Sequence, residues 1–132
     1  MIKAAVIGLG KMGISHAAIL GGLPDVELAA VCDTDGLIQS GFGKLTRIPF
    51  FTDYRKMIDT VRPDCVYVIT PTRMHYEMVK YALQNGCHVF CEKPFAVGSI
   101  RRMERVFFKG KYVCTVFSHP ECEGMPEKNE NE

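Results

Sequence analysis

Three glycines near the amino end have the spacing of a phosphate-binding turn. They are Gly8, Gly10 and Gly13, which follow the apolar run 2–7 and open a stretch with helical spacing. The first permits a tight turn, the second lets the backbone approach a pyrophosphate without a Cβ in the way, and the third lets the helix pack close to the strand. Glycine turns also join strands to helices for structural reasons alone, but this context favours an anion at the helix N-terminus. The predicted cofactor-binding turn consists of Gly8, Leu9, Gly10, Lys11, Met12 and Gly13.

An acidic residue, Asp33, stands twenty residues after the last of these glycines, at the end of the second apolar run. A carboxylate in that place can accept the hydroxyl protons of an adenosine ribose. The next residues, Thr34 and Asp35, offer no arginine for a 2′-phosphate, and a second acid would repel one. The pattern therefore predicts NAD rather than NADP as cofactor. The alternative interpretation of Asp33 is a helix cap after the strand.

Two further polar groups follow the apolar runs 65–69 and 87–91. The first is Thr70-Pro71 with His75 four residues on, and the second is Glu92-Lys93-Pro94. The carboxyl ends of strands are where ligands bind in open parallel sheets. A lysine there can polarise the oxygen on the carbon that gives or takes a hydride, although a strand-end lysine can also be simply exposed. The histidine has two open interpretations, as a site residue or as a capping or packing residue.

The glycine turn, the Thr-Pro with its histidine and the Glu-Lys-Pro after the next strand together resemble the glucose-fructose oxidoreductase, inositol dehydrogenase and rhizopine-catabolism (Gfo/Idh/MocA) family. The resemblance covers residues 2 to about 97, and Glu92-Lys93-Pro94 is its most specific element. It implies that the glycines and Asp33 bind the adenosine and pyrophosphate. Roles on the nicotinamide side follow from the same resemblance. Thr70 and Pro71 would line the nicotinamide, Glu92 would contact its ribose, Lys93 would be catalytic at the substrate oxygen, and His75 would be a further cofactor-binding residue.

The elements that must position these residues alternate between apolar runs and amphipathic stretches. This alternation is typical of parallel strands covered by helices on both faces. We therefore predict an α/β fold, a Rossmann-type doubly wound parallel sheet of about six strands. The expected strands are 2–7, 26–32, 48–51, 65–69, 87–91 and 112–117, and the expected helices are 11–20, 53–59, 74–83 and 99–108. The stretch 34–44 is interrupted by glycines, and the sequence leaves open whether it forms a helix.

The chain divides into an expected dinucleotide-binding domain, 1–120, and a tail, 121–132. The tail holds five acids and one lysine, a net charge of −4, and is expected to be disordered. Members of the resembled family carry a second α+β domain with further catalytic residues, and we expect none within these 132 residues. Loss of that domain would expose apolar surface, which favours a homo-oligomer.

Composition bears on the expected binding partners and on the expected location of the protein. The formal net charge is +1 and tryptophan is absent, which gives no reason to expect nucleic-acid binding. The sequence has neither an apolar run of membrane-spanning length nor a signal-peptide pattern, so a cytoplasmic protein is expected. The six cysteines are predicted to be reduced thiols, and their spacing with histidine predicts no metal site.

Two functions of different classes follow. The first is an NAD-dependent oxidoreductase that transfers a hydride between NAD and a sugar, polyol or related hydroxyl compound. The second is a truncated or repurposed NAD-binding module without substrate turnover. Family resemblance favours the first, and the catalytic residues that the sequence lacks favour the second.

Overall fold

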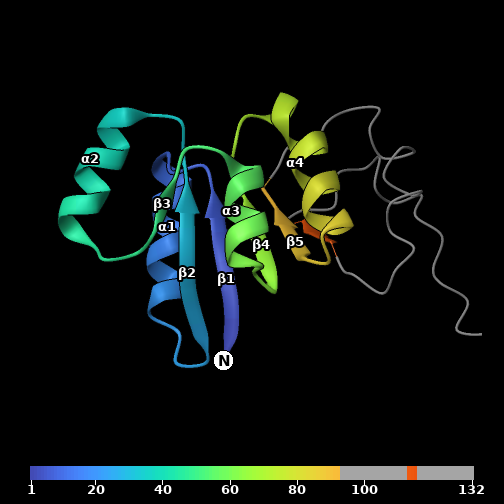
Figure 1. Ribbon diagram of the computed structural model, residues 1–132, viewed down its shortest axis with the longest axis horizontal. Coiled ribbons are helices and arrows are strands. Elements are labelled where there is room, and N and C mark those ends of the chain that lie inside the picture. The colour runs from blue at the N-terminus through green and yellow to red at the C-terminus, as the bar shows by residue number, and fades with distance from the viewer. Residues whose placement is uncertain (93–112, 116–132) are drawn as a thin grey trace, which may run out of the picture.

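The computed structural model describes residues 1–92 and 113–115. Six strands form one sheet: β1 (Ile2–Ile7), β2 (Val26–Cys32), β3 (Phe50–Phe51), β4 (Cys65–Val68), β5 (His88–Cys91) and β6 (Val113–Thr115). Every pairing between them is parallel, and the spatial order is β3-β2-β1-β4-β5-β6 (Figure 1). This is the strand order of a doubly wound dinucleotide-binding sheet, so the predicted fold class is confirmed.

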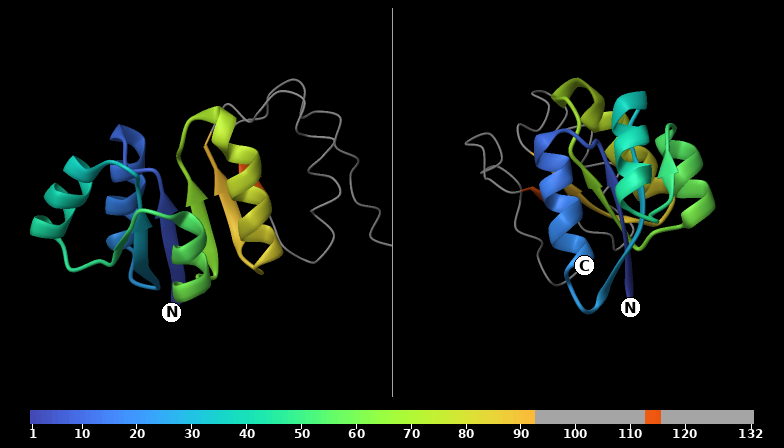
Figure 2. Two further views of the ribbon diagram at one scale, coloured as in Figure 1. Left: turned by 45° about the horizontal axis from the view of Figure 1, so that its top comes forward. Right: turned by 90° about the vertical axis from the view of Figure 1, so that its left-hand side faces the viewer.

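Four helices connect the first five strands: α1 (Lys11–Gly21), α2 (Gly36–Leu45), α3 (Tyr54–Val61) and α4 (Thr72–Gln84). Figure 2 shows α1 on one side of the sheet and α3 and α4 on the other. Since the strands run parallel, each helix returns the chain across a face of the sheet. All strands therefore end at one edge, where the loops that lead into the helices gather.

The core has two layers, one on each face of the sheet. On the α3 and α4 side, alternate residues of the strands pack against Met57, Ile58, Val79 and Ala82, which are 0–1% exposed. On the other side, Ala17 and Leu20 of α1 cover the remaining strand positions. This division explains the near-continuous apolar runs, because a strand buried on both faces needs an apolar side chain at every position.

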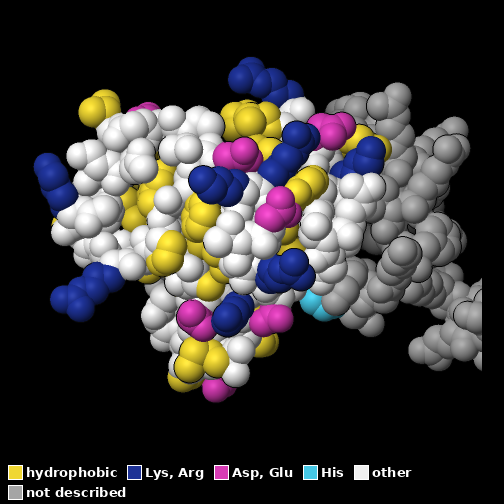
Figure 3. Space-filling model, in the orientation of Figure 1, with side chains coloured by type: hydrophobic (Ala, Val, Ile, Leu, Met, Phe, Trp, Pro, Cys, Tyr) yellow, Lys and Arg dark blue, Asp and Glu magenta, His cyan; other side chains and the backbone are white. Residues whose placement is uncertain are grey.

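The outer surface of α3 and α4 is polar. Figure 3 shows basic and acidic side chains interspersed over this face. Asp59 accepts a hydrogen bond from the hydroxyl of Tyr81 at 2.7 Å, and the Arg55 guanidinium lies 5.5 Å from the centroids of Tyr54 and Tyr81. These contacts join the two helices on the solvent side of the layer.

The structure settles the stretch that the sequence left open. Residues 36–45 form α2, and the Asp35 carboxylate caps it by accepting from the backbone N–H of Leu37 at 2.8 Å and of Ile38 at 3.4 Å. A capped N-terminus compensates for the glycines within the helix, which lower its intrinsic stability.

Other boundaries moved by a few residues. The strand expected at 48–51 is only Phe50–Phe51. The helix expected at 74–83 is Thr72–Gln84, with Asn85 as its C-cap and Gly86 after it at φ +83°. The helix expected at 99–108, the domain boundary at 120 and the acidic tail 121–132 all lie outside the described residues.

Within residues 1–92 and 113–115, no helix combines the length and the apolar character needed to cross a bilayer.

Candidate functional site

The turn after β1 lies in contact with the end of β4. Gly8 has φ +93°, and a Cβ placed on it would lie 2.5 Å from the carbonyl oxygen of Ile69 and 2.9 Å from Cγ2 of Thr70. Its N–H donates to the carbonyl of Cys32 at the end of β2, at 2.8 Å. Only glycine satisfies both the positive φ and the close approach. The turn is thereby held between three strand ends, at the place where the strand order reverses and ligands bind in such sheets.

The third glycine, Gly13, joins α1 to this turn. A Cβ on it would lie 1.8 Å from the carbonyl oxygen of Gly8, closer than any non-bonded atom can approach. Gly13 is therefore a packing glycine, as its place in the motif predicted.

The second glycine, Gly10, has a different environment. It is the N-cap of α1 and provides no side-chain hydrogen bond to the helix, and nothing lies within 4 Å of a Cβ built on it. Lys11 and Met12 in the first turn are exposed, and no acidic residue occurs there. The start of α1 is therefore exposed at residues 10–12, with open space beside Gly10 and the positive end of the helix dipole behind it. These are the conditions in which a pyrophosphate fits.

The carboxylate of Asp33 joins the end of β2 to the glycine turn. Its Oδ2 accepts from the N–H of Leu9 at 2.7 Å, and its Oδ1 accepts from the N–H of Asp35 at 2.9 Å. The side chain that caps α2 belongs to Asp35, so the interpretation of Asp33 as the helix cap is wrong. Asp33 lies half-buried beside the turn, with its carboxylate at the carboxyl end of the sheet.

The segment after β4 is held by His75. This side chain is 1% exposed, and its Nε2 donates to the carbonyl of Thr70, since a carbonyl can only accept. The hydroxyl of Thr70 lies 3.3 Å from Sδ of Met78, and Pro71 is exposed at the start of α4. Of the two interpretations of His75, its burial matches the packing role, in which the imidazole supports the Thr70-Pro71 segment from within the core.

The end of β5 brings Glu92 to the same edge. Its N–H donates to the carbonyl of Val68 at 3.0 Å, and its Oε2 lies 3.1 Å from Nε2 of His16 on α1. His16 was not predicted as a site residue. Its position three residues after Gly13, on the same side of the helix, was the available signal. The predicted catalytic residue Lys93 lies outside the described residues.

Two thiols lie beside the acidic residues of this edge, Cys32 next to Asp33 and Cys91 next to Glu92. Burial, together with the neighbouring carboxylates, raises the pKa of each thiol to about 12. Such thiols are protonated at neutral pH, whereas a cysteine nucleophile reacts as the thiolate. Both are free thiols that pack in the core.

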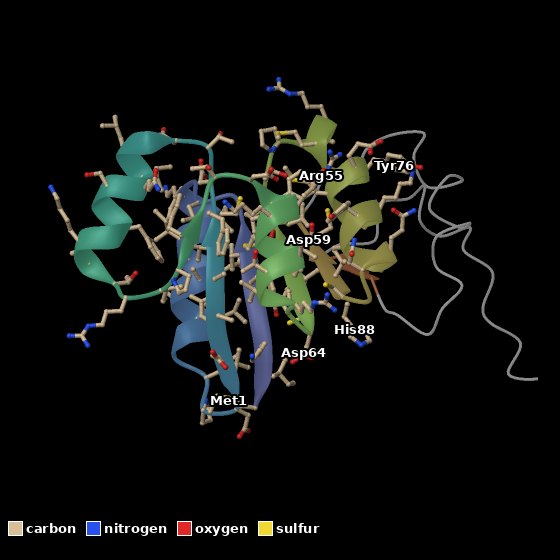
Figure 4. The ribbon with its side chains drawn as sticks, viewed as in Figure 1. Met1, Arg55, Asp59, Asp64, Tyr76 and His88 are labelled. Carbon is tan, nitrogen blue, oxygen red and sulfur yellow. The ribbon has the colours of Figure 1, made fainter. Side chains whose placement is uncertain are left out.

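A cavity of about 370 Å³ lies at the opposite end of the sheet, where the strands begin. Asp59, Asp64, Asn85 and His88 are among its lining residues. Asp59, Asp64 and His88 are labelled in Figure 4. It is distant from the glycine turn, and open parallel sheets bind their ligands at the other edge, so we do not assign the site to this cavity. Among the residues that the structure describes, no three His, Cys, Asp or Glu side chains gather as a metal ion would require.

Comparison with known proteins is consistent with this geometry. A family model described as "Oxidoreductase family, NAD-binding Rossmann fold" (GFO_IDH_MocA) matches residues 2–117. A D-glucoside 3-dehydrogenase of Escherichia coli K12 is 39% identical over 98 residues, which are 73% of this chain and 28% of the relative.

Solved structures give the same result. The myo-inositol 2-dehydrogenase of Lactobacillus plantarum superposes with a TM-score of 0.77 at 31% identity, over 86% of this chain and 35% of that one. The scyllo-inositol dehydrogenase of Lactobacillus casei, solved with NAD(H) and scyllo-inositol, has a TM-score of 0.78 at 24% identity, over 88% and 36%. At that identity the second likeness shows the fold alone. The chain spans between 28% and 36% of the length of these three proteins.

Proposed function

Because the chain belongs to the oxidoreductase family with the NAD-binding Rossmann fold, we propose that it binds NAD at the carboxyl ends of β1, β2 and β4. The observation that carries this proposal is the environment of Gly10: an uncapped helix N-terminus with open space where a side chain would stand. The pyrophosphate would lie against the N–H groups of residues 10–13, where the helix dipole stabilises negative charge.

The adenosine half of the cofactor would bind through Asp33. Each carboxylate oxygen has more than one lone pair, so Asp33 can accept from ribose hydroxyls while it keeps its bonds to Leu9 and Asp35. A 2′-phosphate in the same place would meet the charges of Asp33 and Asp35. We therefore propose NAD rather than NADP as the cofactor.

The nicotinamide half would lie toward β4 and β5. Thr70 and Pro71 would line the ring, with His75 acting on it only through the segment that it supports. Glu92 would accept a hydroxyl of the nicotinamide ribose, and Lys93, outside the described residues, would polarise the substrate oxygen. NAD, when bound, accepts the hydride from the carbon that carries the hydroxyl.

The proposed substrate class is a sugar, polyol or related hydroxyl compound, with the D-glucoside and inositol dehydrogenases as support. The second candidate function is cofactor binding without substrate turnover. A cytoplasmic location belongs to the same proposal and is supported by the four described cysteines being free thiols.

The binding proposal is tested by replacing Gly10 with valine. We expect NADH affinity to fall at least about tenfold, because the branched side chain would occupy the space of the pyrophosphate, while the free energy of unfolding falls by only about 1 kcal/mol, because valine is a poorer N-cap than glycine. Gly36→Val is the control, since Gly36, the first residue of α2, also lies between a strand and a helix and has nothing within 4 Å of its Cβ position. Equal NADH affinity in Gly10→Val and wild type would contradict the assignment.

Turnover separates the two candidate functions. We expect the purified 132-residue chain to bind NADH but to reduce NAD at a negligible rate with inositol, glucose or glucose 6-phosphate. NADH absorbance at saturating cofactor is the measurement. Clear steady-state turnover by this chain would exclude the binding-module function.

A further inference from the structure

His16 reaches across the sheet to the end of β5. Its Nε2 lies 3.1 Å from Oε2 of Glu92, a residue 76 positions later in the chain, and the side chains are 20% and 16% exposed. A carboxylate offers only acceptors, so the imidazole is the donor. Partial burial strengthens such a charge-assisted hydrogen bond relative to one in water.

Two aromatic rings hold the imidazole in place. Tyr67 and Phe90 occupy paired positions on β4 and β5 and stack with centroids 4.8 Å apart. The His16 ring lies 5.3 Å from Phe90 and 5.9 Å from Tyr67, tilted to both. These contacts restrict the imidazole to orientations in which Nε2 can point at Glu92.

The helix that carries His16 is itself fixed to the glycine turn. Gly13, one turn earlier on α1, touches the carbonyl of Gly8, and Gly8 touches Ile69 and Thr70. The described contacts thus form a chain from the pyrophosphate-binding turn through α1 to Glu92.

We propose that His16 is a positioning residue, which holds Oε2 of Glu92 so that Oε1 accepts a hydroxyl of the nicotinamide ribose. The inference rests on the proposed function, because it assigns how one residue of that NAD site is oriented. His16 does not touch the cofactor in this arrangement. Its role is to keep the carboxylate of the Glu-Lys-Pro segment aligned with the turn that binds the pyrophosphate.

Three ligands of increasing length test the proposal in the intact chain. ADP contains the adenosine and pyrophosphate, ADP-ribose adds the second ribose, and NADH adds the nicotinamide. In His16→Phe, which keeps a ring against Tyr67 and Phe90 but loses the donor, we expect unchanged affinity for ADP. Affinity for ADP-ribose and NADH should fall about tenfold, the loss expected for one hydrogen bond to a charged group.

Three further experiments separate positioning from packing. His16→Gln places an amide donor near the position of Nε2 and should restore most of the affinity for ADP-ribose. Ser15→Ala, a change at an exposed neighbour on α1, should leave all three affinities unchanged. In a Glu92→Ala background, His16→Phe should cause no further loss, because the interaction that it removes is already absent.

The outcomes distinguish this inference from the function on which it rests. Failure of the wild-type chain to bind ADP and NADH would overturn the NAD site itself. Wild-type binding with an equal loss of ADP, ADP-ribose and NADH in His16→Phe would show a purely structural histidine. Unchanged affinity for all three ligands in that variant would also overturn the positioning role.

Discussion

Replacing Gly13 by alanine should lower the free energy of unfolding by about 3 kcal/mol, the upper range for overpacking a site that cannot relax. The added Cβ would lie 1.8 Å from the carbonyl oxygen of Gly8, and this is backbone, not a flexible side chain. Relief requires α1 to move away from the turn, which separates Ala17 and Leu20 from the core that they cover. Urea denaturation followed by circular dichroism measures the change.

Gly21→Ala is the control for that experiment. Gly21 ends the same helix, is exposed, and has nothing within 4 Å of its Cβ position. The same chemical change there should raise stability by about 0.5–1 kcal/mol, because alanine is the better helix former. Changes in the free energy of unfolding that have the same sign at both positions would contradict the close contact between Gly13 and Gly8.

The second large effect is expected at Asp33. Asp33→Ala should lower NADH affinity by about 100-fold, or about 3 kcal/mol, because it removes the acceptor of two ribose hydroxyls. NADPH affinity should fall much less or rise, since the repulsion of a 2′-phosphate is lost with the carboxylate. Fluorescence titration with both cofactors gives the ratio of affinities.

Two variants separate the ribose contact from the bond to Leu9. Asp33→Asn keeps an acceptor for the N–H of Leu9 and should retain stability while it loses NADH affinity. Asp35→Ala removes the cap of α2, which costs about 1 kcal/mol, but should leave NADH affinity nearly unchanged. An equal loss of NADH and NADPH binding in Asp33→Ala would mean that Asp33 only supports the turn.

The sequence predicted those parts of the molecule that depend on local pattern. The strands were visible because each buried strand is apolar at successive positions, and the glycine turn because Gly8 and Gly13 stand where no other residue fits. The helix 36–45 remained open because its glycines weaken the local signal. It forms because Asp35 caps it and because Ile38 and Phe42 pack against the sheet.

Features that depend on distant parts of the chain were not predicted. Sequence alone could not assign the cap of α2 to Asp35 rather than Asp33. The Asp33 carboxylate accepts from the N–H of Leu9, which lies next to it only in the folded sheet, and the Asp35 carboxylate accepts from the N–H of Leu37. The pairing of His16 with Glu92 depends on the register of β5 against β4, which no local pattern specifies. For the same reason the sequence could not decide the place of His75, whose burial follows from the path of α4.

The central position of β1 has a consequence for how this chain acquires its structure. β1 is synthesised well before its neighbour β4, which begins at Cys65, and the backbone N–H of Lys3 donates to the Asp64 carboxylate across 61 positions of chain. The chain must lose the conformational entropy of closing this long loop before β1 and β4 make any contact, and this slows folding. A nascent chain that ends before β4 would therefore present one unpaired edge of β1, whose residues 4–7 are buried in the folded protein, so this is the stage at which aggregation is most to be expected.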